Sequence, residues 1–331
     1  GAGVDTITVK ATDSGANTAN VVIQSGAGAD VVSLDLAGAN EQATVELGAS
    51  DDKLTLQTAT SIGDTLVVDG GEGTDTIDLN GLDLTDGSIT LSNVEVLDDS
   101  AGTATVDGAL LNGKAFTIKG DGNLSTKLDV ELDTAGDYDF SGLTLDATLT
   151  DGIGGLNVTG NSGNDTIVGT SGNDTIATGG GNDTVTGGAG VDAMTAGGGN
   201  DKFIFAAGDT GKTATTVDSI TAFNTAGDDS ISFGVAATAT NYTEVGQIDT
   251  GTTGATFAEL TTAANNALDG TVQFAILEDG TTDAANTGTG SVASNNAYAF
   301  FDRDMDGTAD EVVQLVGVDV SQVAQSDFVA A

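Results

Sequence analysis

Between residues 159 and 205, a large apolar residue stands at every ninth position, surrounded by polar residues and glycine. These residues are Ile167, Ile176, Val185, Met194 and Phe203. A glycine-containing turn followed by a three-residue strand would give this spacing, with the apolar side chain pointing into a narrow core. Two such units predict one coil of a parallel β-roll.

Each nine-residue unit also keeps a glycine at its fourth position and an aspartate at its sixth. The glycines are Gly163, Gly172, Gly181, Gly190 and Gly199, and the aspartates are Asp165, Asp174, Asp183, Asp192 and Asp201. Stacked coils would place each Asp beside the Asp two units later, where like charges repel. A hard cation between them would turn that repulsion into cohesion. Calcium fits best, because it accepts several oxygens at about 2.3–2.6 Å. We therefore predict calcium ligands at these positions.

A flexible polar linker is the other interpretation of so much Gly, Asn, Asp and Thr. A linker has no reason to keep five units in phase, so the pattern favours the roll. The segment resembles the RTX family, whose GGxGxDxUx nonapeptides form calcium-bound β-rolls in bacterial proteins exported by type I systems. Thr178 and Ala196 replace the leading Gly of that pattern, and Asn161 and Thr170 replace the second. We expect these departures to weaken individual sites.

Upstream, a similar motif recurs with a longer period. Asp5, Asp30, Asp52 and Asp75 are separated by 25, 22 and 23 residues. Alternating segments such as "DTLVVD" are typical of strands. The period predicts one coil of an irregular parallel β-helix per repeat, and we expect further irregular coils up to residue 158. These four aspartates are either further calcium ligands or ordinary turn residues, and both interpretations stay open.

The pattern changes after Phe205. "DSITAFNTAGDDSISF" resembles the segment that closes many RTX rolls, which implies oxygen ligands at Asp218 and Asp229. Ile220, Phe223, Ile231 and Phe233 are predicted to pack inward. Residues 256–268 form the one convincing helix, with a capping box between Thr256 and Glu259. Strands are predicted at 272–277, 297–301 and 311–316.

The predicted fold is therefore all-β, a parallel β-helix and β-roll solenoid with a small cap that contains one helix. We assign residues 1–158 to the irregular β-helix and residues 159–233 to the calcium roll. Residues 234–331 form the cap and an export signal.

An acidic loop, "DRDMDGTADE", places Asp302, Asp304, Asp306 and Asp310 around a glycine. Its opening is typical of a calcium loop, but Val313 stands where an EF-hand has its bidentate Glu. Predicted strands on both sides also argue against a helix-loop-helix motif. The loop resembles the Asp-rich hairpin near the end of RTX proteins. An acidic surface turn without an ion is the alternative.

The composition shows a strongly acidic chain that lacks several residue types. The chain has 50 acidic and 8 basic residues, a formal net charge of −42. Nucleic acid and anionic membranes are poor partners for such a surface, and cations have to neutralise its self-repulsion in a compact state. There is no Cys, His, Trp or Pro, which excludes disulfides, thiolate or imidazole metal sites, and Cys or His catalysis. Arg303 is the only Arg, which argues against a polysaccharide lyase. We expect no enzymatic activity.

The last residues, "VDVSQVAQSDFVAA", look like the uncleaved C-terminal signal of type I export, and the first residues lack an N-terminal signal pattern. Because Gly1 already stands inside a repeat, we expect a missing region upstream. Outside the cell, roughly millimolar calcium would load many weak sites and drive folding by mass action.

The long scaffold resembles the S-layer proteins that type I systems export in some Gram-negative bacteria. This resemblance implies a secreted protein that self-associates into a cell-surface lattice. Calcium would bridge its subunits, and the missing upstream region would attach to lipopolysaccharide. The alternative is the C-terminal export and folding module of an RTX exoenzyme, toxin or adhesin. Irregular coils over residues 1–158 favour the lattice protein.

Overall fold

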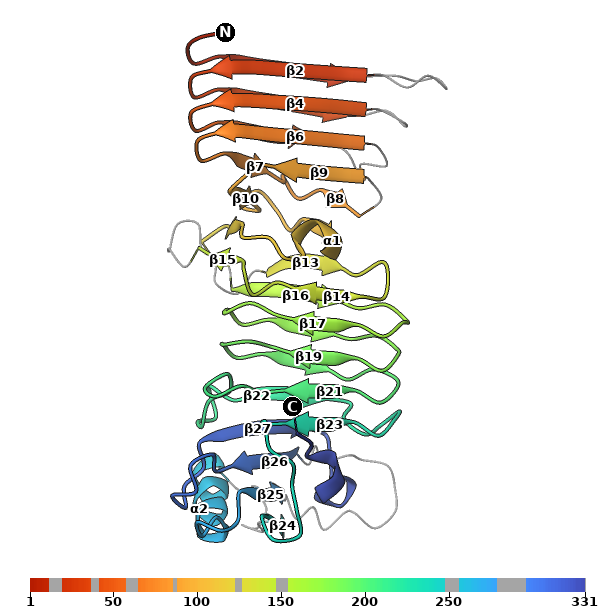
Figure 1. The fold of residues 1–331 in the computed structure, drawn as a ribbon, viewed down its shortest axis with the longest axis vertical. Coiled ribbons are helices and arrows are strands. Elements are labelled where there is room, and N and C mark those ends of the chain that lie inside the picture. Colours follow the sequence, from red (N-terminus) through yellow and green to blue (C-terminus); the bar gives the residue numbers. More distant parts are fainter. Residues whose placement is uncertain are drawn as a thin grey trace. The chain divides into compact units, whose positions relative to one another are not determined.

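The computed structural model describes residues 1–11, 20–36, 42–57, 65–85, 88–122, 127–146, 154–247, 256–278 and 296–330. The chain forms two compact units. Unit 1 comprises Gly1–Asp133 and Tyr138–Thr159, and unit 2 comprises Thr134–Asp137 and Gly160–Ala331. Each unit contains a stack of coils made of short strands (Figure 1). The division into residues 1–158, 159–233 and 234–331 stays a prediction.

The first sheet of unit 1 is parallel throughout and has one strand per coil. In spatial order its strands are β1 (Thr6–Ala11), β3 (Val31–Leu36), β5 (Lys53–Gln57), β7 (Thr76–Asp78), β10 (Val96–Asp98), β12 (Thr117–Lys119) and β15 (Thr144–Leu145). Thr6 pairs with Val31, Val31 with Lys53, and Lys53 with Thr76. These steps repeat the spacing of the four upstream aspartates, so the prediction of one coil per repeat is confirmed.

Two further groups of parallel strands complete the coils of unit 1. One group comprises β2 (Asn20–Ala27), β4 (Gln42–Ala49), β6 (Thr65–Glu72) and β9 (Ser88–Ser92). The other comprises β8 (Asp83–Leu84), β11 (Thr105–Asp107), β13 (Lys127–Glu131) and β16 (Gly155–Thr159). β14 (Asp137–Asp139) contains the point at which the chain passes between the units.

Alternation along the strands builds the core of unit 1. In β5 the side chains of Leu54 and Leu56 are buried, while their neighbours in the strand are only partly covered. Leu54 stacks in register between Val32 and Ile77, and all three are at most 1% exposed. Period-two patterning therefore turns one face of each strand inward, and each coil adds one layer to the column.

Unit 1 also contains a helix that the sequence pattern did not predict, α1 (Gly108–Leu111). The side chain of Asp107 accepts a hydrogen bond from the backbone N–H of Ala109 and caps this single turn. Four residues are too few to show a helical period.

Unit 2 begins with thin coils whose two faces are short parallel strands. One face has β17 (Thr166–Val168), β19 (Thr184–Thr186), β21 (Lys202–Ile204) and β23 (Ser230–Ser232). The other has β18 (Thr175–Ala177), β20 (Ala193–Thr195) and β22 (Asp218–Thr221). Ile167, Val185, Phe203 and Ile231 form one apolar column, and Ile176, Met194 and Ile220 form the other. All seven are at most 1% exposed, which confirms the predicted narrow core.

A thicker cap follows the last coil. β27 (Glu311–Val316) pairs with β22, and β26 (Asn296–Phe301) runs antiparallel to both β27 and β25 (Phe274–Glu278). β24 (Tyr242–Gln247) completes this sheet, and α2 (Phe257–Ala267) packs on it. The predicted capping box between Thr256 and Glu259 is present.

Aromatic residues fill the interior of the cap. The rings of Phe233 and Phe301 stack at 4.9 Å, and Phe274 lies 4.9 Å from Phe301. The C-terminal segment contains the short 3-10 helices η1 (Val320–Gln322) and η2 (Gln325–Asp327). After η2, the ring of Phe328 reaches to 5.2 Å from Phe274. The predicted inward packing of Ile220, Phe223, Ile231 and Phe233 is confirmed, since each is at most 1% exposed.

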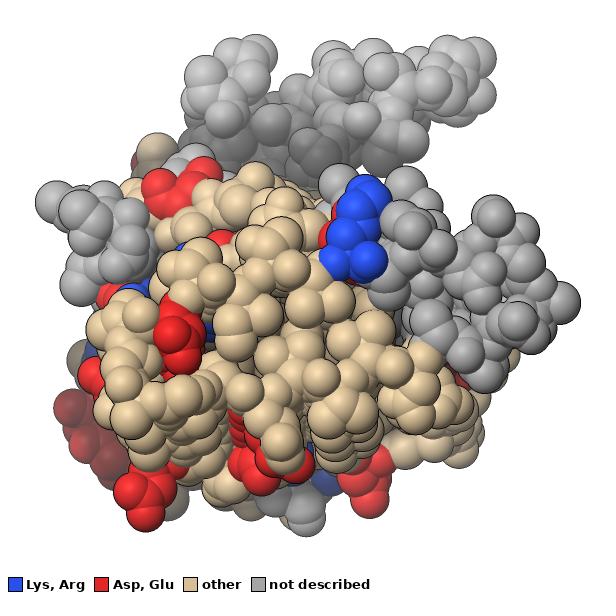
Figure 2. Space-filling model, turned by 90° about the horizontal axis from the view of Figure 1, so that it is seen from above, with Lys and Arg blue, Asp and Glu red and all other residues tan. Residues whose placement is uncertain are grey.

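The surface at the Gly1 end of unit 1 carries acidic side chains along its left and lower sides, and much of the middle is neither acidic nor basic (Figure 2). Val4 and Val22, in the first coil, are exposed. In the described parts of the chain, no helix has the length and hydrophobicity of a transmembrane span.

Close stacking of the turns requires glycine at particular positions. Gly48 has a φ of +110°, and a Cβ on it would overlap the carbonyl oxygen of Gly26 in the preceding coil. Gly113 also has a positive φ, +66°, but has no atom within 4 Å of its Cβ position. Comparing the two separates the cost of the backbone conformation from the cost of coil contact.

We predict that Gly48→Ala lowers the free energy of unfolding by about 2–5 kcal/mol, because strain at positive φ and overlap between coils add up. Gly113→Ala is the matched control and should cost only about 1–2 kcal/mol. Urea denaturation of the full chain measures both changes. Equal losses would mean that the turns of successive coils do not stack as closely as described.

Candidate metal-binding edges

Along one edge of unit 2, aspartates of successive coils form a ladder of hydrogen bonds. The backbone N–H of Asp165 donates to Oδ1 of Asp183 at 2.8 Å, and that of Asp183 donates to Oδ1 of Asp201 at 2.9 Å. Asp201 donates in the same way to Asp229 at 2.9 Å, and Gly136 donates to Asp165. The predicted pairing of each Asp with the Asp two units later is therefore present.

A second ladder follows the other edge of the same coils. The N–H of Asp174 donates to Oδ1 of Asp192, and that of Asp192 donates to Oδ1 of Asp218, both at 2.8 Å. The N–H of Asp218 donates to the hydroxyl of Thr210 at 3.0 Å, which ends the series. Both edges of the roll thus use one carboxylate oxygen of each aspartate to join coils.

The second oxygen of several of these carboxylates makes no hydrogen bond. Oδ2 of Asp183, Asp201 and Asp218 is buried and has no hydrogen-bond partner among the described residues. Each of these residues is at most 1% exposed. A buried polar atom without a partner costs about 1–3 kcal/mol, and more when it is charged. These oxygens are therefore suited to a bound cation.

Burial also makes ionisation of these groups costly. It raises the pKa of Asp218 to about 7 and that of Asp201 to about 6, and it raises the pKa of Asp183 as well. A backbone N–H is a neutral donor and leaves the net charge of its carboxylate in place. A cation against Oδ2 would supply the missing countercharge, and an all-oxygen site without Cys or His suits calcium.

Glycines at the turns let the backbones of successive coils approach closely. Gly181, Gly190 and Gly199 have φ between +119° and +133°, and a Cβ on any of them would overlap a carbonyl oxygen of the preceding coil. These three of the five glycines predicted at the fourth position therefore lie where two turns meet. Carbonyl oxygens and Asp carboxylates are the oxygen ligands that calcium accepts.

In the first two nine-residue repeats, a polar side chain bonds the aspartate of the same turn. The N–H of Thr170 donates to Oδ2 of Asp174 at 2.7 Å, and its hydroxyl donates to the same carboxylate at 3.0 Å. Asn161 approaches Asp165 in a similar way, through its side-chain amide at 3.3 Å. Side chains of these two residues also accept the N–H groups of Gly172 and Gly163. These carboxylates are bonded within their own turns. That such departures weaken individual sites stays a prediction.

Asp229, at the last coil, is also hydrogen-bonded on both oxygens. It accepts from Asp201 on Oδ1 and from the N–H of Asn224 on Oδ2 at 2.7 Å. Of the ligands implied for the closing segment, Asp218 has an unbonded oxygen and Asp229 does not.

The aspartates predicted from the longer upstream period form a third ladder, in unit 1. Asp5, Asp30, Asp52 and Asp75 lie on one edge, and Glu95 follows them. Glu95 was not expected from the sequence, because residues 88–94 contain no glycine and its spacing from Asp75 is 20 residues.

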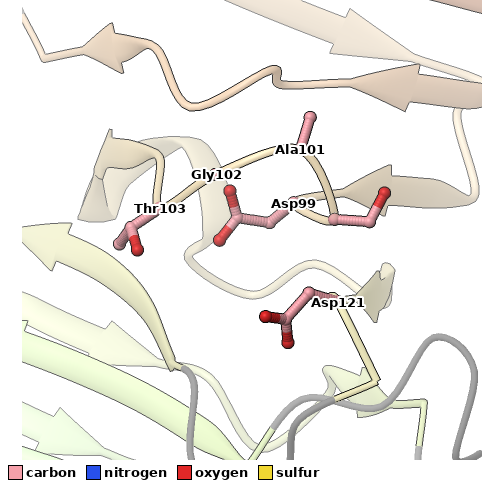
Figure 3. Close-up of a pocket in the computed structure, with 6 residues that line it drawn as sticks. Asp99, Ala101, Gly102, Thr103 and Asp121 are labelled. Carbon is pink, nitrogen blue, oxygen red and sulfur yellow. The ribbon is translucent and has the colours of Figure 1, made fainter.

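Unit 1 also holds a pocket that no sequence motif indicated. It has a volume of about 190 Å³ and is lined by Asp99, Asp121, Thr103 and the residues between Asp99 and Thr103 (Figure 3). Asp99 is 7% exposed, and its Oδ1 accepts the N–H of Ala104 at 2.8 Å. Burial raises the pKa of Asp99 to about 8, and the negative charges of Asp129, Asp98 and Asp121 add to the increase.

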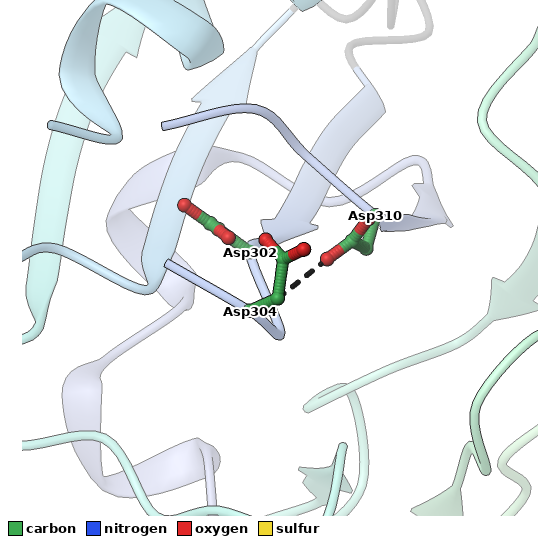
Figure 4. A group of neighbouring side chains, drawn as sticks. All are labelled: Asp302, Asp304 and Asp310. Atoms are coloured by element: carbon green, nitrogen blue, oxygen red, sulfur yellow. Dashed lines mark hydrogen bonds between the residues drawn. The ribbon is translucent and has the colours of Figure 1, made fainter. Parts of the chain in front are cut away.

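The acidic loop predicted near the end joins β26 to β27. Oxygens of Asp302, Asp304 and Asp310 lie within 4.8 Å of one another (Figure 4). Asp306 is not in this group, and its carboxylate accepts hydrogen bonds from Thr308, which lower its pKa. The flanking strands are antiparallel, as expected for a hairpin and not for an EF-hand.

Existing hydrogen bonds already occupy much of this acidic group. Asp302 is fully buried, and its Oδ2 accepts the N–H of Gly307 at 2.8 Å. Oδ2 of Asp310 accepts N–H groups from Arg303 and Asp304, and Lys212 lies 3.4 Å from Oδ1 of Asp310. The loop could hold a cation, but the ion-free interpretation also stays open.

Comparison with known families identifies the repeat. Residues 159–194 and 178–210 match the RTX calcium-binding nonapeptide repeat (4 copies). The match contains strands β17 to β21 and the five regular aspartates. Repeats of this type bind multiple calcium ions, so calcium is the cofactor of these edges. The parallel coils of unit 2 are the β-roll that such repeats form. A search of curated proteins found no relative of the chain.

We predict that Asp183→Asn lowers the number of bound calcium ions by at least one per chain and weakens the remaining sites. The amide can still accept the N–H of Asp165, but it lacks the charge that a cation needs. Asp228→Asn is the matched control, since Asp228 is exposed on the same unit. Elemental analysis after gel filtration counts the ions, and equal counts in the two variants would contradict the assignment.

We also predict that Asp99→Asn stabilises the chain at pH 8. A pKa that rises on folding from 3.8 to about 8 means that the folded state binds more protons between these values. The free energy of unfolding then falls as the pH rises through this window, by up to about 1.4 kcal/mol per pH unit. Asparagine removes this loss and keeps the acceptor for Ala104.

Thermal unfolding of the full chain with calcium should show a gain of about 1–3 kcal/mol for Asp99→Asn at pH 8 and none near pH 4. The exposed Asp133→Asn is the control for the change in net charge. A loss of stability at pH 8 would instead mean that Asp99 is ionised and holds a cation.

Proposed function

We propose that this chain is part of an exported structural protein that folds on binding calcium outside the cell and assembles into a surface lattice. The observation that carries the calcium-dependent step is the set of buried, unbonded carboxylate oxygens at Asp183, Asp201 and Asp218. Without cations the folded roll holds repelling charges in its edges. At roughly millimolar calcium, mass action favours the folded state.

Export through a type I system accounts for the same features. RTX repeat proteins are typically secreted, and a chain with net charge −42 would remain expanded where calcium is scarce. Folding would then follow export, when the sites fill. The segment from 318 to 331 remains the proposed export signal.

A structural role is favoured over an enzymatic one by the state of the single arginine. Arg303 donates to both carboxylate oxygens of Glu311, at 2.7 and 2.9 Å, and to the carbonyl of Phe233. Its guanidinium also lies 5.3 Å from the centre of the Phe301 ring. The residue therefore supports the cap and is poorly placed to assist proton abstraction from a sugar acid.

Self-association would also depend on cations. Acidic side chains lie along the left and lower sides of the surface at the Gly1 end of unit 1 (Figure 2), and like charges oppose contact between copies. Calcium ions between copies would remove that repulsion. In this proposal calcium first folds each chain and then bridges subunits.

The second candidate is the export and folding module of an RTX exoenzyme, toxin or adhesin. The matched repeat favours it equally, because the match covers residues 159–210 and does not depend on the rest of the chain. Assembly separates the two candidates.

Negative-stain electron microscopy of the purified chain tests the proposal. We predict ordered sheets at millimolar calcium and none with EGTA or with magnesium at equal ionic strength. The magnesium sample controls for screening of charge alone. Dispersed, folded monomers at the same calcium concentration would count against the lattice and favour the export module.

A further inference from the structure

We propose that unit 1 holds its own row of calcium ions along the edge formed by Asp30, Asp52 and Asp75, with Glu95 at its end. These residues lie outside the part of the chain that matches the RTX repeat. The inference extends calcium-dependent folding from the thin coils of unit 2 to the longer coils of unit 1. It does not depend on assembly into a lattice.

The edge of unit 1 has the same ladder as the two edges of unit 2. The N–H of Asp30 donates to Oδ1 of Asp52 at 2.6 Å, and that of Asp52 donates to Oδ1 of Asp75 at 2.9 Å. Asp5 donates to Asp30 at 2.7 Å, and Asp75 donates to a carboxylate oxygen of Glu95 at 2.8 Å. Each of these bonds joins one coil to the next.

The second oxygen of each central aspartate lacks a partner. Oδ2 of Asp30, Asp52 and Asp75 is buried and makes no hydrogen bond to any described residue. The three residues are 1%, 2% and 0% exposed, so bulk solvent does not reach these oxygens. This is the condition of Asp183 and Asp201 in the matched repeat, where the ligand is calcium.

The turns before these aspartates also repeat the geometry of unit 2. Gly26 and Gly28 precede Asp30 with φ of +112° and +120°, and Gly71 and Gly73 precede Asp75 with +100° and +140°. In unit 2, Gly179 and Gly181 precede Asp183 with +94° and +119°.

In the middle coil of unit 1, Gly48 and Ser50 take these two places. A Cβ on Gly48 or Gly71 would overlap the carbonyl oxygen of the preceding turn, so no side chain enters between the turns. Carbonyl oxygens and aspartate Oδ2 atoms therefore form the lining of this edge.

Nearby lysines do not supply the missing positive charge. Lys53 directly follows Asp52, but its Nζ lies 2.9 Å from Asp78 and 3.5 Å from Asp98. Lys10 is bonded to Asp35 at 2.6 Å. The N-terminal ammonium of Gly1 lies 3.5 Å from Asp5 at the start of the ladder. No ion pair among the described residues reaches Asp30, Asp52 or Asp75, so a bound cation would offset the repulsion between them.

Calcium is the cation that this lining fits. Its donors are carboxylate and carbonyl oxygens, and the chain has no His or Cys for a softer metal. Magnesium requires near-ideal octahedral geometry and keeps several waters, for which a buried edge has little room. Calcium accepts an irregular set of oxygens, which suits coils of unequal length.

Hydrogen–deuterium exchange of the full chain during a calcium titration tests the inference. Peptides within 20–57 report on the ladder of unit 1, and peptides within 160–205 report on the matched repeat. We expect calcium to protect both groups in the unmodified chain. We expect Asp52→Asn to raise the calcium concentration for half-protection of the unit 1 peptides at least tenfold, while the unit 2 peptides keep their curve.

Asp51→Asn is the matched control, because Asp51 is the exposed neighbour of Asp52 and the charge change is the same. It should behave like the unmodified chain. Glu95→Gln tests the end of the row if Asp52→Asn fails to fold, and it should shift the same unit 1 curve in the same direction.

Protection of the unit 1 peptides that is equal in EGTA and in calcium would overturn the inference, as would identical curves for Asp52→Asn and Asp51→Asn. In either case the unit 2 peptides still show whether the matched repeat responds to calcium. Failure of the unit 1 row is therefore distinguishable from failure of calcium-dependent folding as a whole, and from failure of lattice assembly.

Discussion

The fold depends on one type of hydrogen bond, which pairs only one of the two oxygens of an aspartate carboxylate. In each ladder, a backbone N–H bonds one oxygen of the next aspartate and holds two coils in register, as between Asp183 and Asp201. The donor is neutral, so the charge remains, and in Asp183 and Asp201 the other oxygen is buried without a partner among the described residues. A large core side chain contributes roughly 1.5–3 kcal/mol, and each strand of the roll offers only one. An uncompensated buried charge costs several kcal/mol. The core alone is therefore a weak counterweight, and the cation is part of the folded state.

The same turn serves coils of different size. Successive aspartates are 18 residues apart in the roll and 22 or 23 apart in the middle coils of unit 1, yet the hydrogen bond between them is the same. Glycine before the aspartate lets the backbone of one turn lie directly against a carbonyl oxygen of the preceding turn, as Gly48 does against Gly26. The strands between turns are free to lengthen, as long as each keeps alternate residues inside. This separation of roles explains why strand length varies along the chain while the spacing of Gly and Asp within the turn hardly does.

Much of the fold and of the aspartate ladders could be predicted from the sequence, because the same pattern of glycine, aspartate and apolar residues recurs in one coil after another. The nine-residue period located the apolar columns, and the longer period located the coils of unit 1. Backbone pairing makes the strands of a coiled sheet follow one another at the same intervals as the aspartates beside them. Isolated features were harder to find. Glu95 closes its ladder from a turn without glycine, and Asp99 is buried beside a pocket that it shares with Asp121, a residue that only the fold brings near it. Thr170 and Asn161 looked like simple departures from a motif, although their side chains bond the carboxylates that the motif leaves exposed to the ion.

Unit 2 is held together in two ways, by aspartate ladders in the roll and by apolar packing in the cap that follows it. The roll is one side chain deep on each face and carries the aspartate ladders. The cap is held by stacked rings, with Phe233 of the last coil against Phe301 and with Phe274 between Phe301 and Phe328. Apolar packing of this type needs no ion. Strand β27 of the cap pairs with β22, which belongs to the last coils of the roll. The pairing covers the edge of β22 that would otherwise lie open, so an apolar cap that needs no cation closes a roll whose edges do need them.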